Sequence, residues 1–221
     1  MKLSDHYRYR LYEILPGLSI WLTLISVVSL SFVRPLWMIY FIIIFDVYWV
    51  LRVIYFAFYT IISWQRFRRA VKRKWFDLLR QEFPKWSEKI NVVFLPMYNE
   101  NWIVVKYTLD SICQSSYPAD KIYIVISGEE RKLEHWLKIQ ERLKEEFAQK
   151  FADIIFYTHP QNLSGEIQGK GSNVHYAEWQ FKKYADKKKW DYKNIIVSVL
   201  DIDTVTHPEY FSHLTYMYCY H

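Results

Sequence analysis

The sequence predicts an α/β domain with a mainly parallel sheet, preceded by a hairpin of two transmembrane helices. Residues 14–64 are almost continuously apolar, and the chain beyond Glu88 alternates strand-like and helix-like segments. Every strand-like segment is followed by polar or glycine-rich residues. We divide the chain into an N-terminal segment (1–13), two membrane helices (14–64), a basic juxtamembrane helix or linker (65–88) and an α/β domain (89–221).

The apolar region contains two runs long enough to cross a bilayer. Ile14–Val33 is a twenty-residue run without a charge, and a helix of that length spans ~30 Å of hydrocarbon. Arg34-Pro35 interrupts the pattern, and Leu36–Trp64 is long enough to span with tilt or to emerge as a helix. Asp46 and Arg52 lie inside the second run, either facing partners in a larger bundle or near a helix end.

Basic residues flank the apolar region on both sides, whereas only Arg34 lies between its two runs. Because such flanks favour the cytoplasmic side, we expect an integral protein of the plasma or inner membrane with both termini and the soluble domain in the cytoplasm. The cluster after the second run equals the whole net charge of +6, so it is expected to touch anionic headgroups rather than nucleic acid. The flanking residues are Lys2, Arg8 and Arg10 on one side and Arg66, Arg68, Arg69, Lys72, Arg73 and Lys74 on the other.

The segment 66–83 repeats apolar side chains at three- and four-residue intervals, with basic residues between them. This pattern predicts one amphipathic helix that ends at Pro84. The helix either lies in the membrane interface or packs on the soluble domain as a linker, and the sequence favours neither. Its apolar residues are Phe67, Val71, Trp75, Leu78, Leu79 and Phe83.

The α/β domain shows four short apolar runs that alternate with helical patterns. Such alternation is typical of a parallel sheet covered on both faces. The expected strands are 90–95, 121–126, 153–157 and 194–200, and the expected helices are 102–113, 132–151, 172–184 and one beginning near Pro208. The core face of the helix 132–151 is expected to consist of Leu133, Leu137, Leu143 and Phe147.

Polar residues follow each of the four strands at its carboxyl end. Ligands bind beyond the carboxyl ends of the strands in sheets of this kind, so we expect one site assembled from four loops. The loops are Pro96–Glu100, Ser127–Glu130, Gly165–Asn173 and Asp201–Thr204.

Asp201 and Asp203 leave the last strand two positions apart. In an extended chain both carboxylates point to the same side, where they repel each other unless a cation compensates. A hard divalent ion such as Mg²⁺ or Mn²⁺ fits, because Mg²⁺ commonly bridges one or two carboxylates to substrate phosphates. The alternative is a turn in which an Asp caps the following helix. His207 lies nearby and is more often structural than a ligand.

Lys170 lies between two glycines at the start of a predicted helix. Glycines let backbone amides approach an anion, and the lysine adds charge at the positive end of the helix. A flexible loop with a solvated lysine is the alternative. Glu129 and Glu130 either begin the next helix or bind a nucleobase, and Tyr98 and Glu100 carry a similar ambiguity.

Five segments in this order resemble the family 2 glycosyltransferases, including processive polysaccharide synthases of the cellulose-synthase kind. They are VVFLPMYNE (92–100), TLDSI with SYP (108–118), KIYIVISGEE (121–130), GKGSNVHYA (169–177) and VLDIDT (199–204). The resemblance implies a GT-A-like, Rossmann-like fold that binds a nucleotide sugar.

The resemblance also implies roles for individual residues. Pro96, Tyr98 and Glu100 would line the nucleoside pocket, and Lys170 would approach the nucleotide and its phosphates. Asp201 and Asp203 would hold the ribose and the metal-diphosphate. The family usually has an Asp after the second strand for the uracil edge, and here Glu129 or Glu130 must substitute.

The family's catalytic base and its Q-x-x-R-W segment lie further downstream than the end of this sequence. We therefore expect a truncated domain, with the base beyond His221 and the acceptor half missing. The implied activity is inverting transfer from a nucleotide-diphosphate sugar, with UDP-sugar the expected donor, to a glycan or lipid-linked acceptor. The alternative is a non-catalytic, membrane-tethered nucleotide-sugar-binding or assembly partner.

Overall fold

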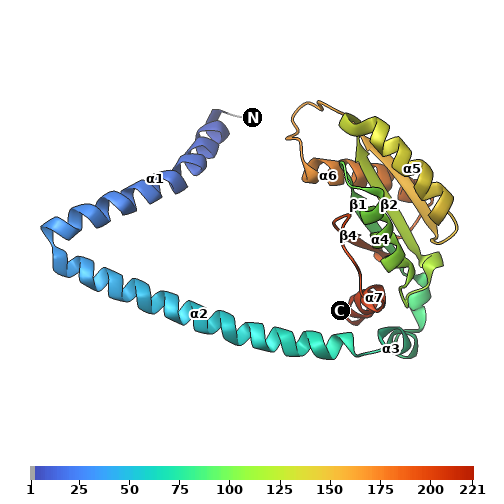
Figure 1. Ribbon diagram of the computed structural model, residues 1–221, viewed down its shortest axis with the longest axis horizontal. Helices are drawn as coiled ribbons and strands as arrows, with labels where there is room; N and C mark the ends of the chain where they lie inside the picture. The colour runs from blue at the N-terminus through green and yellow to red at the C-terminus, as the bar shows by residue number, and fades with distance from the viewer. Residues whose placement is uncertain (1–2) are drawn as a thin grey trace. The chain divides into compact units, whose positions relative to one another are not determined.

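The computed structural model describes residues 3–221, with side chains from Tyr7 onward (Figure 1). Lys2, one of the predicted flanking charges, and the first two positions of the segment 1–13 lie outside the described residues. The chain divides into two units, Met1–Arg68 and Arg69–His221.

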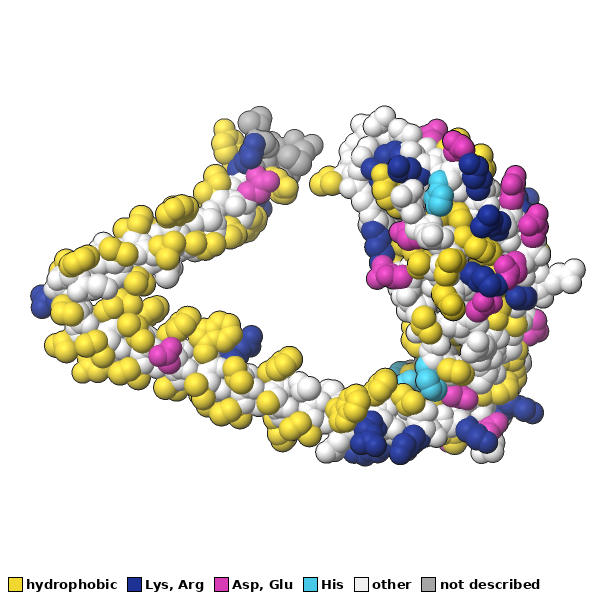
Figure 2. All heavy atoms as spheres, in the orientation of Figure 1, with side chains coloured by type: hydrophobic (Ala, Val, Ile, Leu, Met, Phe, Trp, Pro, Cys, Tyr) yellow, Lys and Arg dark blue, Asp and Glu magenta, His cyan; other side chains and the backbone are white. Residues whose placement is uncertain are grey.

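Two long apolar helices form the first unit. α1 (Leu3–Val33) starts well before the predicted Ile14, and α2 (Pro35–Val71) begins with the proline that the sequence marked as a break. Both are long and apolar enough to cross a membrane, and their most apolar windows are unburied. Figure 2 shows hydrophobic side chains along both helices. An apolar surface of this size needs a cover, and a bilayer is one that fits it.

The single amphipathic helix predicted over 66–83 is wrong. The structure ends α2 at Val71 and starts a separate helix, α3 (Trp75–Glu82), after three intervening residues. Trp75 and Leu79 are buried, and α3 packs against α7 (Tyr210–Tyr220). The apolar face of α3 therefore belongs to the core of the second unit, which is the linker interpretation rather than the interfacial one. A short 3₁₀ turn, η1 (Pro84–Glu88), leads into the sheet.

The second unit is built on a parallel four-stranded sheet in the order β3-β2-β1-β4. The strands are β1 (Ile90–Pro96), β2 (Ile122–Glu129), β3 (Asp153–His159) and β4 (Ile195–Val199). All three strand pairs are parallel, which confirms the predicted α/β class. The chain first moves outward from β1 to β3 and then returns to the other side of β1. The carboxyl ends of β1 and β4 thus form a topological switch point, where such sheets bind ligands.

Helices cover both faces of this sheet. α4 (Trp102–Cys113) and α5 (Leu133–Phe147) contribute, with α3 and α7, to the larger buried cluster on one face. α6 (Lys170–Lys187) packs its buried side chains against the other face of β1 and β2. Val197 and Val199 of the edge strand β4 point to the α6 face and stay 50% and 43% exposed.

The buried face of α5 differs in part from the prediction. Leu143 and Phe147 are buried as expected, but Leu133 and Leu137 are exposed and Trp136 and Ile139 take the inner positions. Trp136 fits there because Gly128 of β2 has no side chain: a Cβ on Gly128 would lie 2.3 Å from the indole ring.

Candidate functional site

A cavity of about 400 Å³ lies at the carboxyl edge of the sheet, beside the β1–β4 switch point. The loops after β1, β2 and β4 and the start of α6 all contribute to it, which confirms that four loops come together at one place. The volume is in the range of small-molecule sites. The lining residues are Pro96, Met97, Tyr98, Glu100, Glu129, Arg131, Gly169, Lys170, Asn173, Asp201, Ile202 and Asp203.

Asp201 and Asp203 both line this cavity, on either side of a buried residue. Ile202 is 4% exposed and packs in the core, whereas both aspartates are exposed. The Thr108 hydroxyl of α4 donates to the Ile202 carbonyl at 2.6 Å, and Thr204 N donates to the Asp201 carbonyl at 3.0 Å. The segment is a turn rather than an extended chain, yet both aspartates line the same cavity.

Lys170 is the first residue of α6, and its ammonium contacts the Asp201 carboxylate. The preceding Gly169 and Ser172 close the first turn reciprocally: Gly169 N donates to Ser172 Oγ at 3.2 Å, and that hydroxyl donates to the Gly169 carbonyl at 2.8 Å. The positive end of the helix and the ammonium thus meet at the cavity, where both favour an anionic ligand.

The donor set suits a hard divalent cation. Asp201 and Asp203 supply carboxylate oxygens, and Mg²⁺ usually takes one or two carboxylates together with substrate phosphates. The Lys170 ammonium contacts Asp201, so a positive charge already lies beside the two aspartates, at the place where a bound cation would offset their repulsion.

The loop after β1 is fixed by a carboxylate. Glu100 Oε2 accepts hydrogen bonds from Tyr98 N at 2.7 Å and from Asn99 N at 3.0 Å. The Glu100 carbonyl accepts a third from His135 Nε2 of α5, at 2.9 Å. Tyr98 and Glu100 both line the cavity, and the hydrogen bonds show that Glu100 also holds the loop in shape.

The two glutamates after β2 separate in the structure. Glu129 lies in the cavity wall, but its side chain is only 7% exposed and is bound by Arg131, with 2.6 Å between Nε and Oε2. Glu130 is not among the residues that line the cavity; its carboxylate accepts from Gln161 N at 2.8 Å. His207 likewise lies outside the cavity, and its Nδ1 accepts from Glu209 N at 3.2 Å, as a structural histidine does.

Arg131 and Asn173 line the cavity although the sequence indicated no role for either side chain; Asn173 ends one of the four predicted loops, and Arg131 directly follows another. Asn173 is buried, and its Nδ2 donates to the Ser127 carbonyl at 2.9 Å and to the Met97 carbonyl at 3.4 Å. It therefore ties together the ends of β1 and β2. Its position three residues after Lys170 puts both on one face of α6, which is the signal that could have indicated it.

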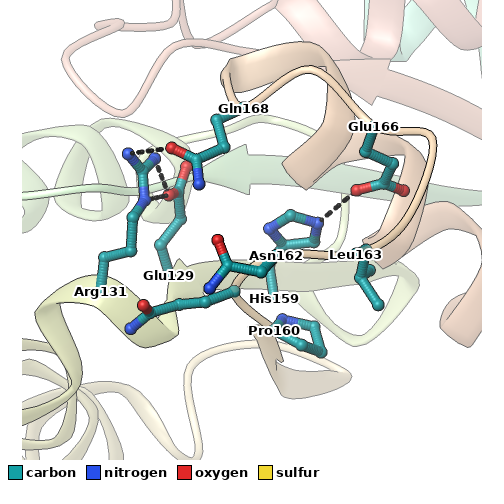
Figure 3. A pocket seen from close by; sticks show the side chains of 9 residues that line it. Glu129, Arg131, His159, Pro160, Asn162, Leu163, Glu166 and Gln168 are labelled. Carbon is teal, nitrogen blue, oxygen red and sulfur yellow. Dashed lines mark hydrogen bonds and ion pairs between the residues drawn. The ribbon is translucent and has the colours of Figure 1, made fainter.

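A smaller cavity of about 130 Å³ adjoins the first and shares Glu129 and Arg131 with it (Figure 3). The loop between β3 and α6 forms much of its wall. His159, which is buried at the end of β3, lies 3.0 Å from the Glu166 carboxylate of that loop. This contact joins the loop that carries Gly169 and Lys170 to the sheet.

Fold and site together define a parallel α/β domain with a charged cavity at its topological switch point, preceded by two long apolar helices. No protein-family model matches the chain, and no curated protein matches it. The crystal structure of S. aureus TarS 1-349 is similar at a TM-score of 0.37 and 16% identity, over 56% of this chain and 30% of that one. A crystal structure of S. aureus TarS has a TM-score of 0.32 and 18% identity, over 52% and 16%. The chain spans less than a third of either structure.

Proposed function

We propose that this chain is the donor-binding part of a membrane-anchored, inverting glycosyltransferase of family 2 with a GT-A-type domain. The observation that carries this proposal is the convergence of Asp201, Asp203 and Lys170 on one cavity at the β1–β4 switch point. A carboxylate pair for a cation beside a cationic helix start suits a ligand with a diphosphate. The donor would be a nucleotide-diphosphate sugar, with UDP-sugar the expected one.

Each part of the cavity has a distinct task in this proposal. Pro96, Tyr98 and Glu100 would bound the nucleoside, because they form the wall after β1. Lys170 would neutralise phosphate charge. Asp201 would hold the ribose and, with Asp203, Mg²⁺ or Mn²⁺, which supplies charge neutralisation for the leaving diphosphate.

The reaction is a direct displacement at the anomeric carbon. The acceptor hydroxyl forms the new carbon–oxygen bond while the bond to the diphosphate breaks, and a carboxylate base takes the hydroxyl proton. The four carboxylates of the cavity already have other tasks in this proposal, so none of them is assigned as the base. The acceptor would be a glycan or a lipid-linked sugar, which suits a domain held at a membrane.

Binding measurements on the full chain in detergent test the proposal. Isothermal titration with UDP should give binding that strengthens with Mn²⁺, and both Asp201→Ala and Asp203→Ala should remove that strengthening. Glu209→Ala serves as a matched control, because Glu209 lies after the same turn but outside the cavity. If no nucleoside diphosphate binds, or if both aspartate variants keep the metal dependence, the proposal is wrong.

A further inference from the structure

Arg131 occupies the wall that the two cavities share. Its Nε donates to Glu129 Oε2 at 2.6 Å and its Nη2 contacts the same oxygen, while Nη1 donates to Gln168 Oε1 at 3.2 Å (Figure 3). The guanidinium also lies 4.9 Å from the centroid of the Tyr98 ring. One side chain thus connects the end of β2, the loop before α6 and the loop after β1.

This arrangement determines which charge a ligand can reach. The Glu129 side chain is 7% exposed, whereas that of Arg131 is 30% exposed. A guanidinium has five N–H donors, and three of them are used by Glu129 and Gln168. One donor on each Nη remains, so the wall after β2 offers hydrogen-bond donors to the cavity, although the sequence places a carboxylate there.

We propose that Arg131 is the specificity-determining residue for the donor's nucleobase, and that it selects a base with a carbonyl oxygen at the position where its counterpart has an amino group: uracil over cytosine, or guanine over adenine. The inference rests on the proposed function and names the chemistry of its nucleoside subsite. A carbonyl oxygen accepts from the free Nη donors. An amino group in the same place would set donor against donor and leave both unpaired, a cost that makes such sites selective.

The contact with Tyr98 restrains the position of the guanidinium. The ring lies in the loop that Glu100 holds through two backbone N–H groups, and the guanidinium stacks on that ring. Lys132 Nζ also lies over Tyr98, at 5.9 Å, but Lys132 lines neither cavity. It is therefore a matched control: a neighbouring cation on the same ring that does not face the ligand.

The test compares UDP with CDP, and GDP with ADP, by titration of each nucleotide into the full chain in detergent with Mn²⁺. For the pair whose ring size fits the cavity we expect the carbonyl base to bind at least about tenfold more tightly, the worth of one charged hydrogen bond. Arg131→Gln should reduce that ratio to within about twofold, through weaker binding of the carbonyl base. Lys132→Gln should leave it unchanged.

A second pair of variants keeps the test decisive if Arg131→Gln does not fold. Arg131→Lys retains a cation for the buried Glu129 but loses the planar fork, so it should bind nucleotide with the selectivity reduced. Glu129→Gln removes the carboxylate and keeps the guanidinium, so the selectivity should persist. Selectivity lost in Glu129→Gln but kept in both Arg131 variants would assign base reading to the carboxylate and overturn the inference, as would a preference for the amino base. Nucleotide binding without selectivity overturns this inference alone, whereas no binding overturns the proposed function with it.

Discussion

Lys170 Nζ contacts the Asp201 carboxylate across the cavity, from the first residue of α6 to the turn after β4. Both side chains are more than half exposed, at 52% and 63%, so the pair contributes little to folding. The contact instead affects how a cation and a phosphate bind in the cavity. A cation that binds Asp201 has to displace an ammonium, and the displaced ammonium becomes available to a phosphate. Cation and diphosphate are therefore expected to strengthen each other's binding.

Lys170→Gln should separate these two effects. Without the competing ammonium, Mn²⁺ alone should bind about two- to fivefold more tightly, which is the range of an exposed ion pair. UDP in the presence of Mn²⁺ should bind about tenfold more weakly, because a charged partner of the phosphate is lost. Mn²⁺ binding measured by electron paramagnetic resonance reads the first quantity, and isothermal titration reads the second.

Lys182→Gln is the matched control for that substitution, since Lys182 is also on α6 but lies over Trp179, outside the cavity. It should change neither value. Weaker Mn²⁺ binding in Lys170→Gln would show that the ammonium does not compete for Asp201.

Thr108 should stabilise the turn that carries Asp201 and Asp203. Its hydroxyl donates to the Ile202 carbonyl at 2.6 Å, and both residues are buried. Thr108→Val keeps the shape but leaves this carbonyl unpaired, so we expect a loss of about 1–2 kcal/mol in stability and weaker metal-dependent UDP binding. Thr108→Ser restores the donor and should recover the metal dependence. Equal UDP affinity in the Val variant and the wild type would mean that the hydrogen bond does not position Asp201 and Asp203.

The convergence of the four loops was predictable because it follows from topology. Parallel strands joined by helices place all their carboxyl ends at one edge, whichever side chains they carry. Asp201, Asp203 and Lys170 were found this way. The position of Arg131 in the cavity was not predicted, because its side chain contacts residues from three separate loops and the order of residues in the sequence does not reveal such contacts.

Local periodicity was less reliable where a close backbone contact decided the packing. For α5 we predicted that leucines face the core, but Trp136 occupies an inner position, because Gly128 on the neighbouring strand leaves room for an indole. The break after Val71 was missed for a related reason. The apolar spacing continues through the break, and the packing of Trp75 in the core becomes visible only in three dimensions.

Gly128→Ala should destabilise the soluble unit. The added Cβ would lie 2.3–2.7 Å from three ring atoms of Trp136, which is itself 1% exposed and cannot move outward freely. We expect a loss of about 1–3 kcal/mol from overpacking, seen as a lower melting temperature in near-ultraviolet circular dichroism. Gly171→Ala is the control, because a Cβ there meets nothing within 4 Å. Trp136→Leu in the Gly128→Ala background should recover part of the loss, and purely additive losses would contradict the proposed clash.

The predicted orientation in the membrane can be tested at the break between α1 and α2. Arg34 is the one residue between the two helices, so two membrane-spanning helices with cytoplasmic ends would place it on the outer side. We expect Arg34→Cys, in a Cys113→Ser and Cys219→Ser background, to react with a membrane-impermeant maleimide on intact cells. Lys72→Cys, just beyond α2, should react only after permeabilisation. Labelling of Lys72→Cys on intact cells would show that the orientation is the opposite of the one predicted. It would also place the cavity of the α/β unit away from the cytoplasmic supply of sugar nucleotides, and that outcome would count against the proposed glycosyl transfer as well as against the topology.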